Sequence, residues 1–115
     1  MKGYPGVTTA TRKDGTLYYR SSITISNRHI SLGSFDCLEK ASAAYQTACT
    51  IMRDHQYHIL DYSPSLALDF SKFIILVNFR DNGLYFKTPI YLYKSYFYYY
   101  LTPEQYFIFD REDLF

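Results

Sequence analysis

The sequence predicts an α+β fold: a three-stranded antiparallel sheet packed on one helix, followed by a helix and an aromatic-rich β-hairpin. Three observations lead to this prediction. Short alternating segments separated by turn residues lie before residue 35, which is the pattern of an antiparallel meander. An apolar stripe at helical spacing follows over residues 38–52. The aromatic residues, 20% of the chain, are densest after residue 84, where alternation returns.

Length and charge indicate two parts with different roles. The chain has 115 residues and is 48% hydrophobic, enough for one small domain with an appended piece. We expect a sheet-and-helix domain over residues 3–58 and an aromatic-rich α+β extension over residues 59–115. Residues 1–58 contain seven Lys/Arg and four Asp/Glu, whereas residues 59–115 contain five and seven. The resulting charges of +3 and −2 differ in sign, as expected for two separate functions.

Several classes of protein are not expected. No apolar run reaches transmembrane length and no charged-then-apolar leader opens the chain, so we expect neither a membrane partner nor export. Cys37 and Cys49 fall on the predicted helix, roughly 18 Å apart at the helical rise and beyond disulfide reach. Free thiols fit a reducing compartment, so we expect a cytoplasmic protein. No glycine-rich phosphate loop or nucleophile–base pair is visible, and we expect no cofactor.

We expect three strands in the first part, joined by two tight turns. The first strand lies within residues 1–10, and the Asp-Gly pair of Arg12–Gly15 indicates the first turn. The clearest strand is Leu17–Ile25. Ser26-Asn27 makes the second turn, because Asn tolerates positive φ, and Arg28–Ser34 is the third strand.

Alternation along these strands separates an apolar face from a polar one. Ile23, Ile30 and Leu32 fall on the inner face, toward the helix. The outer face carries Thr8, Ala10, Arg20, Ser22, Thr24, His29 and Ser31. Five cationic residues lie in or beside this sheet, and Asp14 is the one acidic residue among them. The cations are Lys2, Arg12, Lys13, Arg20 and Arg28. Arginines and hydroxyls are common donors to DNA phosphates, so these positions are candidates for DNA contact.

The helix that follows is expected to begin at an N-cap and to end between residues 54 and 58. Asp36 suits the N-cap, and Glu39 three residues later completes a capping box. The stripe consists of Leu38, Ala41, Ala44, Tyr45, Ala48, Ile51 and Met52. Because the stripe is rich in alanine, the helix can approach the sheet closely.

The residues of this first part resemble a known family. Leu32-Gly33-Ser34-Phe35-Asp36, with Glu39, Ala41, Ala44-Tyr45 and Ala48, is similar to the "LGxFDxxExAxxAYxxA" core of the Apetala-two/ethylene-response-factor DNA-binding domain. Tyr4-Pro5-Gly6-Val7 resembles its opening "YxGV", and Tyr19–Ile23 its "WxAxI" strand. The match covers about residues 3–54 in order. It implies that the outer face of the sheet binds double-stranded DNA in the major groove.

The chain differs from the plant members of this family at the base-contacting positions. Those members are rich in arginine there, with tryptophan and glutamate, whereas this chain has Thr8, Ala10, Ser22, Thr24, His29 and Ser31. Only Arg12, Arg20 and Arg28, at neighbouring positions, could take the place of the arginines that contact bases in the plant members. The plant target sequence is therefore not transferred. The chain is more similar to the compact form found in bacteria and phages, often attached to mobile-element nucleases, with roles that include transcription regulation.

The second part is expected to begin with a helix. Ser63-Pro64 suits a helix start, and Asn82-Gly83 a helix end. A strand over Phe73–Phe79 is the competing interpretation, and we favour the helix. Strands are then expected over Leu84–Lys87 and Ile90–Leu101. A turn follows over residues 102–105, a returning strand over residues 106–110 and the start of a helix over residues 110–115.

The last residues carry a second, short resemblance. Residues 95–115 are similar to the segment that precedes the metal-binding core of HNH homing endonucleases. HNH chemistry needs a histidine base, and no histidine follows His58. We therefore expect no catalytic residue in this chain, and a chain that is part of a longer protein. A metal site needs three or four ligands, and His55-x-x-His58 supplies two. Asp54 and Asp61 are near enough in the sequence to complete such a site, but we expect no metal.

Two functions of different classes remain open. The first is DNA binding through the sheet. The alternative is a protein-interaction or inhibitor protein that keeps the fold, has lost the DNA face and binds a protein partner through its aromatic half. The run Tyr91–Tyr100 is compatible with a base-stacking platform, but Lys87 and Lys94 are its only nearby cations, and we favour packing. The cluster of Asp110, Glu112 and Asp113 is expected to cap the last helix.

Overall fold

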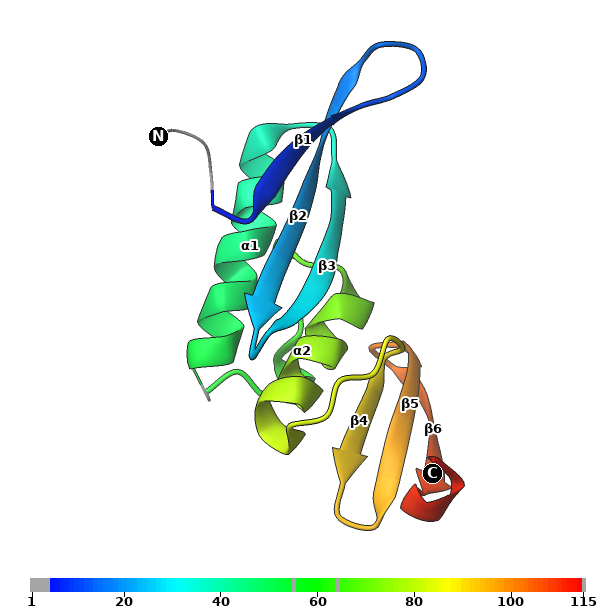
Figure 1. Cartoon of the computed structure of the whole chain (residues 1–115). Coiled ribbons are helices and arrows are strands. Elements are labelled where there is room, and N and C mark those ends of the chain that lie inside the picture. The colour runs from blue at the N-terminus through cyan, green and yellow to red at the C-terminus, as the bar shows by residue number, and fades with distance from the viewer. Residues whose placement is uncertain (1–4, 55, 64, 115) are drawn as a thin grey trace. The chain divides into compact units, whose positions relative to one another are not determined.

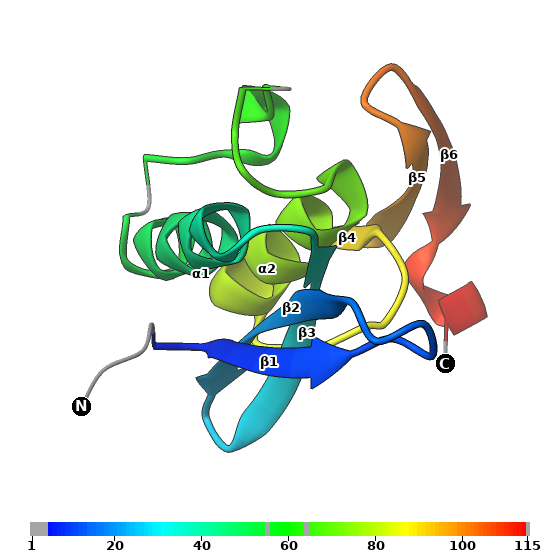
Figure 2. The same cartoon turned by 90° about the horizontal axis from the view of Figure 1, so that it is seen from above.

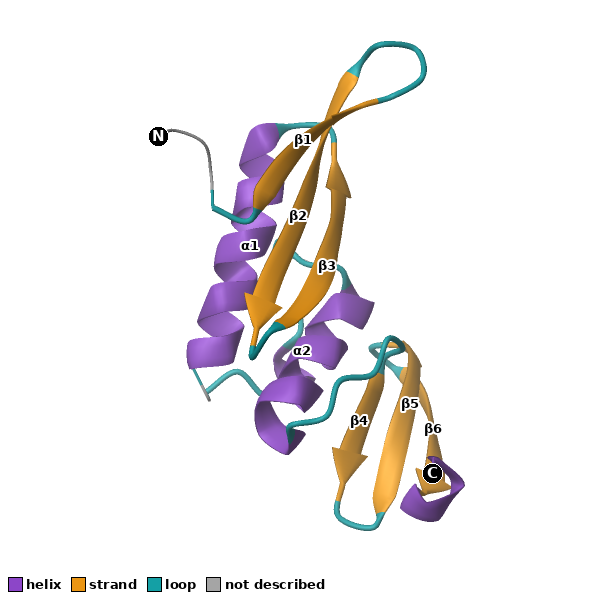
Figure 3. Cartoon of the chain, viewed as in Figure 1, coloured by secondary structure: helices purple, strands orange, loops and turns teal. Residues whose placement is uncertain are grey.

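The computed structural model describes residues 5–54, 56–63 and 65–114, with no side chain described for Leu114. Within these residues the fold is α+β, with two three-stranded antiparallel sheets and two α-helices (Figures 1 and 3). The chain divides into two compact units. One comprises Met1–Thr50 and Ser65–Asp69, and the other Ile51–Pro64 and Phe70–Phe115. In the part that the structure describes, no helix combines the length and apolar character needed to cross a membrane.

The first unit contains the predicted meander. Its strands are β1 (Val7–Thr11), β2 (Leu17–Ile25) and β3 (Arg28–Phe35), in the order β1-β2-β3. Ser26 and Asn27 both have positive φ, 50° and 67°, and make the tight β2–β3 turn. The three predicted strands and both turns are confirmed.

Strand β3 contains a β-bulge that the sequence patterns did not predict. Ser21 pairs with Gly33 but Ser22 pairs with Ser31, so Leu32 is an extra residue in β3. Gly33 adopts φ 125°, which a side chain would oppose. The strand continues through the bulge to Phe35, one residue beyond the predicted end at Ser34. Leu32 stays buried.

Helix α1 (Leu38–Arg53) packs on one face of this sheet, as Figure 2 shows from above. Ala41, Ala44 and Ala48 are fully buried, which confirms the predicted alanine stripe. The hydroxyl of Ser21 in β2 donates a hydrogen bond to the carbonyl oxygen of Ala41 at 2.8 Å. Such a bond requires the close approach that alanine permits, because a longer side chain would separate the helix from the strand.

The start of α1 differs from the prediction by one position. The helix begins at Leu38, and the carbonyl oxygen of Cys37 accepts the first helical hydrogen bond, from Ala41 N at 3.3 Å. Cys37 therefore occupies the N-cap position, and the capping box predicted from Asp36 and Glu39 is wrong. Asp36 instead forms an ion pair with Arg12, at 3.2 Å. The helix ends at Arg53, just before the predicted interval.

The second unit begins with a short 3₁₀ helix, η1 (Ile59–Asp61), and contains α2 (Phe70–Asn82). The helix over residues 73–79 is confirmed against the strand alternative. Its end is confirmed too, because Gly83 follows with φ 73°. The helix begins at Phe70, six residues after Pro64, the predicted first helical position. Pro64 itself lies outside the described residues.

The aromatic residues form a second sheet in the order β4-β5-β6. Its strands are β4 (Ile90–Tyr93), β5 (Tyr96–Thr102) and β6 (Gln105–Asp110), followed by the 3₁₀ helix η2 (Arg111–Leu114). The hairpin at residues 102–105 is confirmed. The single run predicted for residues 90–101 is instead divided by a turn at Lys94-Ser95, where Lys94 has φ 58°.

The strand predicted for Leu84–Lys87 is wrong. These residues are irregular, and Leu84 and Phe86 pack against the buried cluster of Ile90, Leu92 and Phe97. Their alternating pattern therefore reflects core packing in a connecting segment and not a strand. The carbonyl oxygen of Leu84 accepts a hydrogen bond from the side chain of Asn78 at 3.0 Å.

Two polar side chains of α2 organise the second unit, and the sequence patterns did not reveal either. Asn78 is fully buried, and its side-chain oxygen accepts the backbone N–H of Leu92 in β4 at 2.9 Å. The Arg80 side chain is 3% exposed and pairs with Asp81 at 2.8 Å. Its guanidinium group also donates to three backbone carbonyl oxygens, those of Ile51, Asp54 and Tyr57. Arg80 thereby caps the last turn of α1, whose carbonyls have no partners within the helix.

Candidate nucleic-acid interface

The outer face of the β1–β3 sheet carries most of the predicted site residues. Residues directly opposite in an antiparallel pair share a face, so the register assigns them. Thr8 pairs with Arg20, and Thr24 pairs with His29. The face consists of Thr8, Ala10, Tyr18, Arg20, Ser22, Thr24, His29, Ser31 and Ser34. None of these outer positions of β1–β3 is acidic.

Tyr18 stands at the centre of two cation–π contacts on this face. The guanidinium carbon of Arg12 lies 5.0 Å from the centroid of the Tyr18 ring, and that of Arg20 lies 5.4 Å from it. Arg20 also donates a hydrogen bond to the Tyr18 hydroxyl at 2.7 Å. The three side chains form what we call the Arg–Tyr–Arg stack. Tyr18 was not among the predicted site residues, although its alternation with Arg20 could have identified it.

The exposure of the outer face varies along the strands. Thr8, Arg20, Thr24, His29 and Ser31 are exposed. Ala10 and Ser22 are half-buried, so they offer less surface to a partner. The structure thus brings seven predicted residues onto one face, and five of them are exposed.

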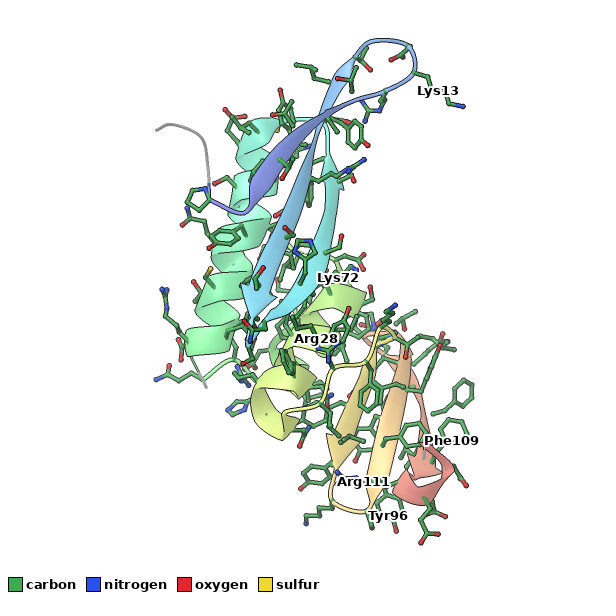
Figure 4. All side chains as sticks on the ribbon, viewed as in Figure 1. Lys13, Arg28, Lys72, Tyr96, Phe109 and Arg111 are labelled. Carbon is green, nitrogen blue, oxygen red and sulfur yellow. The ribbon has the colours of Figure 1, made fainter. Side chains whose placement is uncertain are left out.

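The β1–β2 turn holds two further predicted residues. Lys13 lies at its tip, as Figure 4 shows. Arg12 is held by its ion pair with Asp36 and by a hydrogen bond to the carbonyl oxygen of Leu17 at 3.3 Å. Asp14 accepts hydrogen bonds from the hydroxyl and the backbone N–H of Thr16, which lower the pKa of its carboxyl group. The tip therefore carries charges of both signs at neutral pH.

Arg28 is the predicted residue that the register separates from the others. It pairs with Ile25, which shares the inner face with Ile23. Arg28 therefore lies at the strand end on the helix side of the sheet, not on the outer face with Arg20. Its side chain is exposed. A base contact from the outer face is excluded for it by this register.

The second unit contains a tyrosine-lined cavity of about 310 Å³. It is bordered by His58, Ile59, Leu60, Tyr91, Tyr93, Tyr98, Tyr100 and Tyr106. Burial and a hydrogen bond to Asp81 raise the pKa of Tyr91 to about 12, and burial raises the pKa of Tyr100. These two phenols therefore stay neutral at physiological pH. Phe97 and Tyr100 of the aromatic run are buried, in line with the packing role predicted for it.

Among the described residues, the histidine and acidic side chains considered as metal ligands do not lie together as a metal site. His55 lies outside the described residues, and His58 is exposed. Over residues 5–54, 56–63 and 65–114, no group of three or more His, Cys, Asp or Glu side chains lies close enough to hold a metal ion. Asp110 and Glu112 border a separate cavity of about 500 Å³ together with Ser95 and Arg111. The predicted last helix is the single 3₁₀ turn η2.

Comparisons with family models, with curated proteins and with solved structures find no match to this chain.

Proposed function

We propose that the outer face of the β1–β3 sheet binds double-stranded DNA in the major groove, with sequence-specific or semi-specific recognition. The observation that carries this proposal is the Arg–Tyr–Arg stack, whose two arginines are exposed. It presents two guanidinium groups on a face with hydroxyl and imidazole groups and without an acidic position in β1–β3. The resemblance of residues 3–54 to the Apetala-two/ethylene-response-factor domain supports the same proposal.

Dimensions and chemistry favour the major groove. It is about 12 Å wide and admits a β-ribbon, and its base edges present both donors and acceptors. An arginine in the middle of the face, Arg20, suits bidentate hydrogen bonding to the O6 and N7 atoms of guanine. Thr24, His29 and Ser31 offer groups that both donate and accept. Arg12 and Lys13, at the end of the hairpin, suit contact with phosphates.

The charge distribution agrees with a polyanionic partner for the N-terminal part of the chain. Residues 1–58 carry a formal +3 and residues 59–115 a formal −2. Phosphate neutralisation supplies much of the affinity of DNA-binding proteins, and few cations imply a modest, salt-sensitive affinity. We further propose a cytoplasmic role in a bacterial or phage-infected cell, linked to a mobile element or to transcription regulation. The free cysteines Cys37 and Cys49 fit that compartment.

A polarisation titration with a labelled duplex of random sequence tests the proposal. We expect binding whose affinity falls as salt rises, with a slope set by the number of phosphate contacts. The matched control is Lys40→Ala, an exposed cation on α1 in the same unit, which should leave the affinity unchanged. If no salt-dependent binding occurs with folded protein, the proposal fails, and the alternative of a protein-interaction protein is favoured.

A further inference from the structure

Strand β6 is an apolar edge strand that is exposed along its whole length. It is the last strand of the order β4-β5-β6, and every residue from Gln105 to Asp110 is exposed. The exposed fractions are 48% for Tyr106, 55% for Phe107, 55% for Ile108 and 42% for Phe109. Soluble proteins normally protect such an edge with charges, proline or a covering element, because it pairs readily with another strand. Within β6 itself, no charged residue precedes Asp110.

The direction of the backbone groups shows which residues face the open edge. The N–H of Arg111 donates to the carbonyl oxygen of Ser95 at 2.8 Å, on the β5 side. Backbone groups alternate between the two sides along a strand. Those of Phe107 and Phe109 therefore face β5, and those of Tyr106, Ile108 and Asp110 face outward.

The centre of β6 is symmetric about Ile108, because a phenylalanine lies on each side of it. Phe107 and Phe109 flank it, Tyr106 and Asp110 follow, and Gln105 and Arg111 come next. When two copies of this strand pair antiparallel about a two-fold axis at Ile108, each Phe107 opposes a Phe109. Each Tyr106 hydroxyl can approach an Asp110 carboxylate. Every outward-facing backbone group of these residues then has a partner.

We propose that β6 pairs with β6 of a second copy of this chain, centred on Ile108, and joins the two sheets into one continuous six-stranded sheet. An isologous contact requires a self-complementary surface, which this strand offers. A register centred on Phe107 is disfavoured because it places Asp110 opposite Glu104, which lies outside β6, and so leaves the outward-facing backbone groups of Asp110 without a strand partner. The proposal does not depend on DNA binding by the first unit.

A cysteine placed on the two-fold axis tests the register. In a Cys37→Ser/Cys49→Ser background, Ile108→Cys brings two thiols together across the axis. Opposed residues of a hydrogen-bonded pair have Cα atoms about 5.5 Å apart, within disulfide range. We expect a covalent dimer as the main species after mild oxidation. The control is Phe107→Cys, equally exposed but diagonal to its copy at about 7–8 Å, and it should stay mainly monomeric.

The mass of the protein in solution gives an independent test. Light scattering of the wild-type chain should give about twice 13.6 kDa. Ile108→Lys places two ammonium groups opposite each other and should halve that mass, while a circular dichroism spectrum checks that the variant is folded. Leu60→Lys is the matched control, since Leu60 is 83% exposed and lies outside β6, and it should remain dimeric. A monomeric wild type, or a dimer that Ile108→Lys leaves intact, would overturn the proposal.

Discussion

At the scale of single residues, Tyr18 has a chemical role that depends on its two neighbours. Its ring accepts cation–π contacts from Arg12 and Arg20, and its hydroxyl accepts a hydrogen bond from Arg20. An arginine held in this way loses less side-chain entropy when it binds a ligand. The stack therefore prepares Arg20 for recognition before a partner arrives.

Arg20→Ala should weaken binding to a preferred duplex by about 1–3 kcal/mol and reduce discrimination among sequences, because a bidentate contact with guanine is lost. The measurement is a polarisation titration against a panel of duplexes that differ at one base pair. Arg12→Ala should instead weaken binding to all duplexes alike and flatten the salt dependence by about one unit of slope. An unchanged preference in Arg20→Ala would assign recognition to another residue. Lys72→Ala and Lys94→Ala, in the second unit, should have no effect.

Tyr91 should make the second unit sensitive to alkaline pH. Burial and the bond to Asp81 raise its pKa from 10.0 to about 12 in the folded chain. A raised folded-state pKa contributes stability that is complete below pH 10 and is lost as pH rises toward about 12. Urea unfolding in that interval should show a steeper loss of stability for the wild type than for Tyr91→Phe. Equal slopes for the two proteins would contradict this assignment.

At the scale of secondary structure, periodicity in the sequence was enough for the first unit. Alternation in β1–β3 and the alanine stripe of α1 predicted both faces of the sheet and the buried face of the helix. Periodicity did not predict the places where a bulge or a turn interrupts a strand. The extra Leu32 is absorbed in a bulge, and Lys94-Ser95 makes a turn without Gly or Asn. The structural roles of Asn78 and Arg80 could not be predicted because their hydrogen-bond partners are distant in the sequence. Arg80 and Ile51, for example, are 29 positions apart.

The packing of α1 leads to a prediction for its alanines. Ala44→Leu should lower the free energy of unfolding by about 1–3 kcal/mol, because a fully buried alanine leaves no room for three more carbons. Urea denaturation followed by circular dichroism measures the change. Ala43→Leu, at an exposed position of the same helix, is the control and should be nearly neutral. A similar loss for both variants would indicate that helix propensity and not packing is responsible.

At the scale of the whole molecule, the two units differ in charge and in surface chemistry. The first offers guanidinium and hydroxyl groups on a sheet face, and the second offers tyrosines and an open apolar strand. The candidate DNA face was predictable because it follows from alternation and composition, whereas the position of Arg28 on the inner face required the register. If both proposals hold, two copies joined through β6 carry two DNA faces, and binding becomes bivalent.

The chain by itself should not cut DNA. Plasmid incubated with the purified protein and Mg²⁺, Mn²⁺ or Zn²⁺ should stay supercoiled on an agarose gel, because the chain offers no histidine after His58 to act as the base of an HNH site. A preparation of Arg20→Ala serves as the control for contaminating nucleases. Nicking by the wild type that disappears in this variant would show that the protein itself is a nuclease.

The cap that Arg80 places on α1 also bears on how the chain is synthesised. The carbonyl groups of Ile51, Asp54 and Tyr57 receive their donor from a residue that leaves the ribosome later than they do. Until α2 has emerged, the carbonyl group of Ile51 in the last turn of α1 lacks the donor that Arg80 provides, and helix ends without such partners fray. Ribosome-bound chains arrested before and after residue 80 has emerged should therefore differ in the protease sensitivity of residues 51–57. The last turn of α1 would then become ordered only after α2 is available.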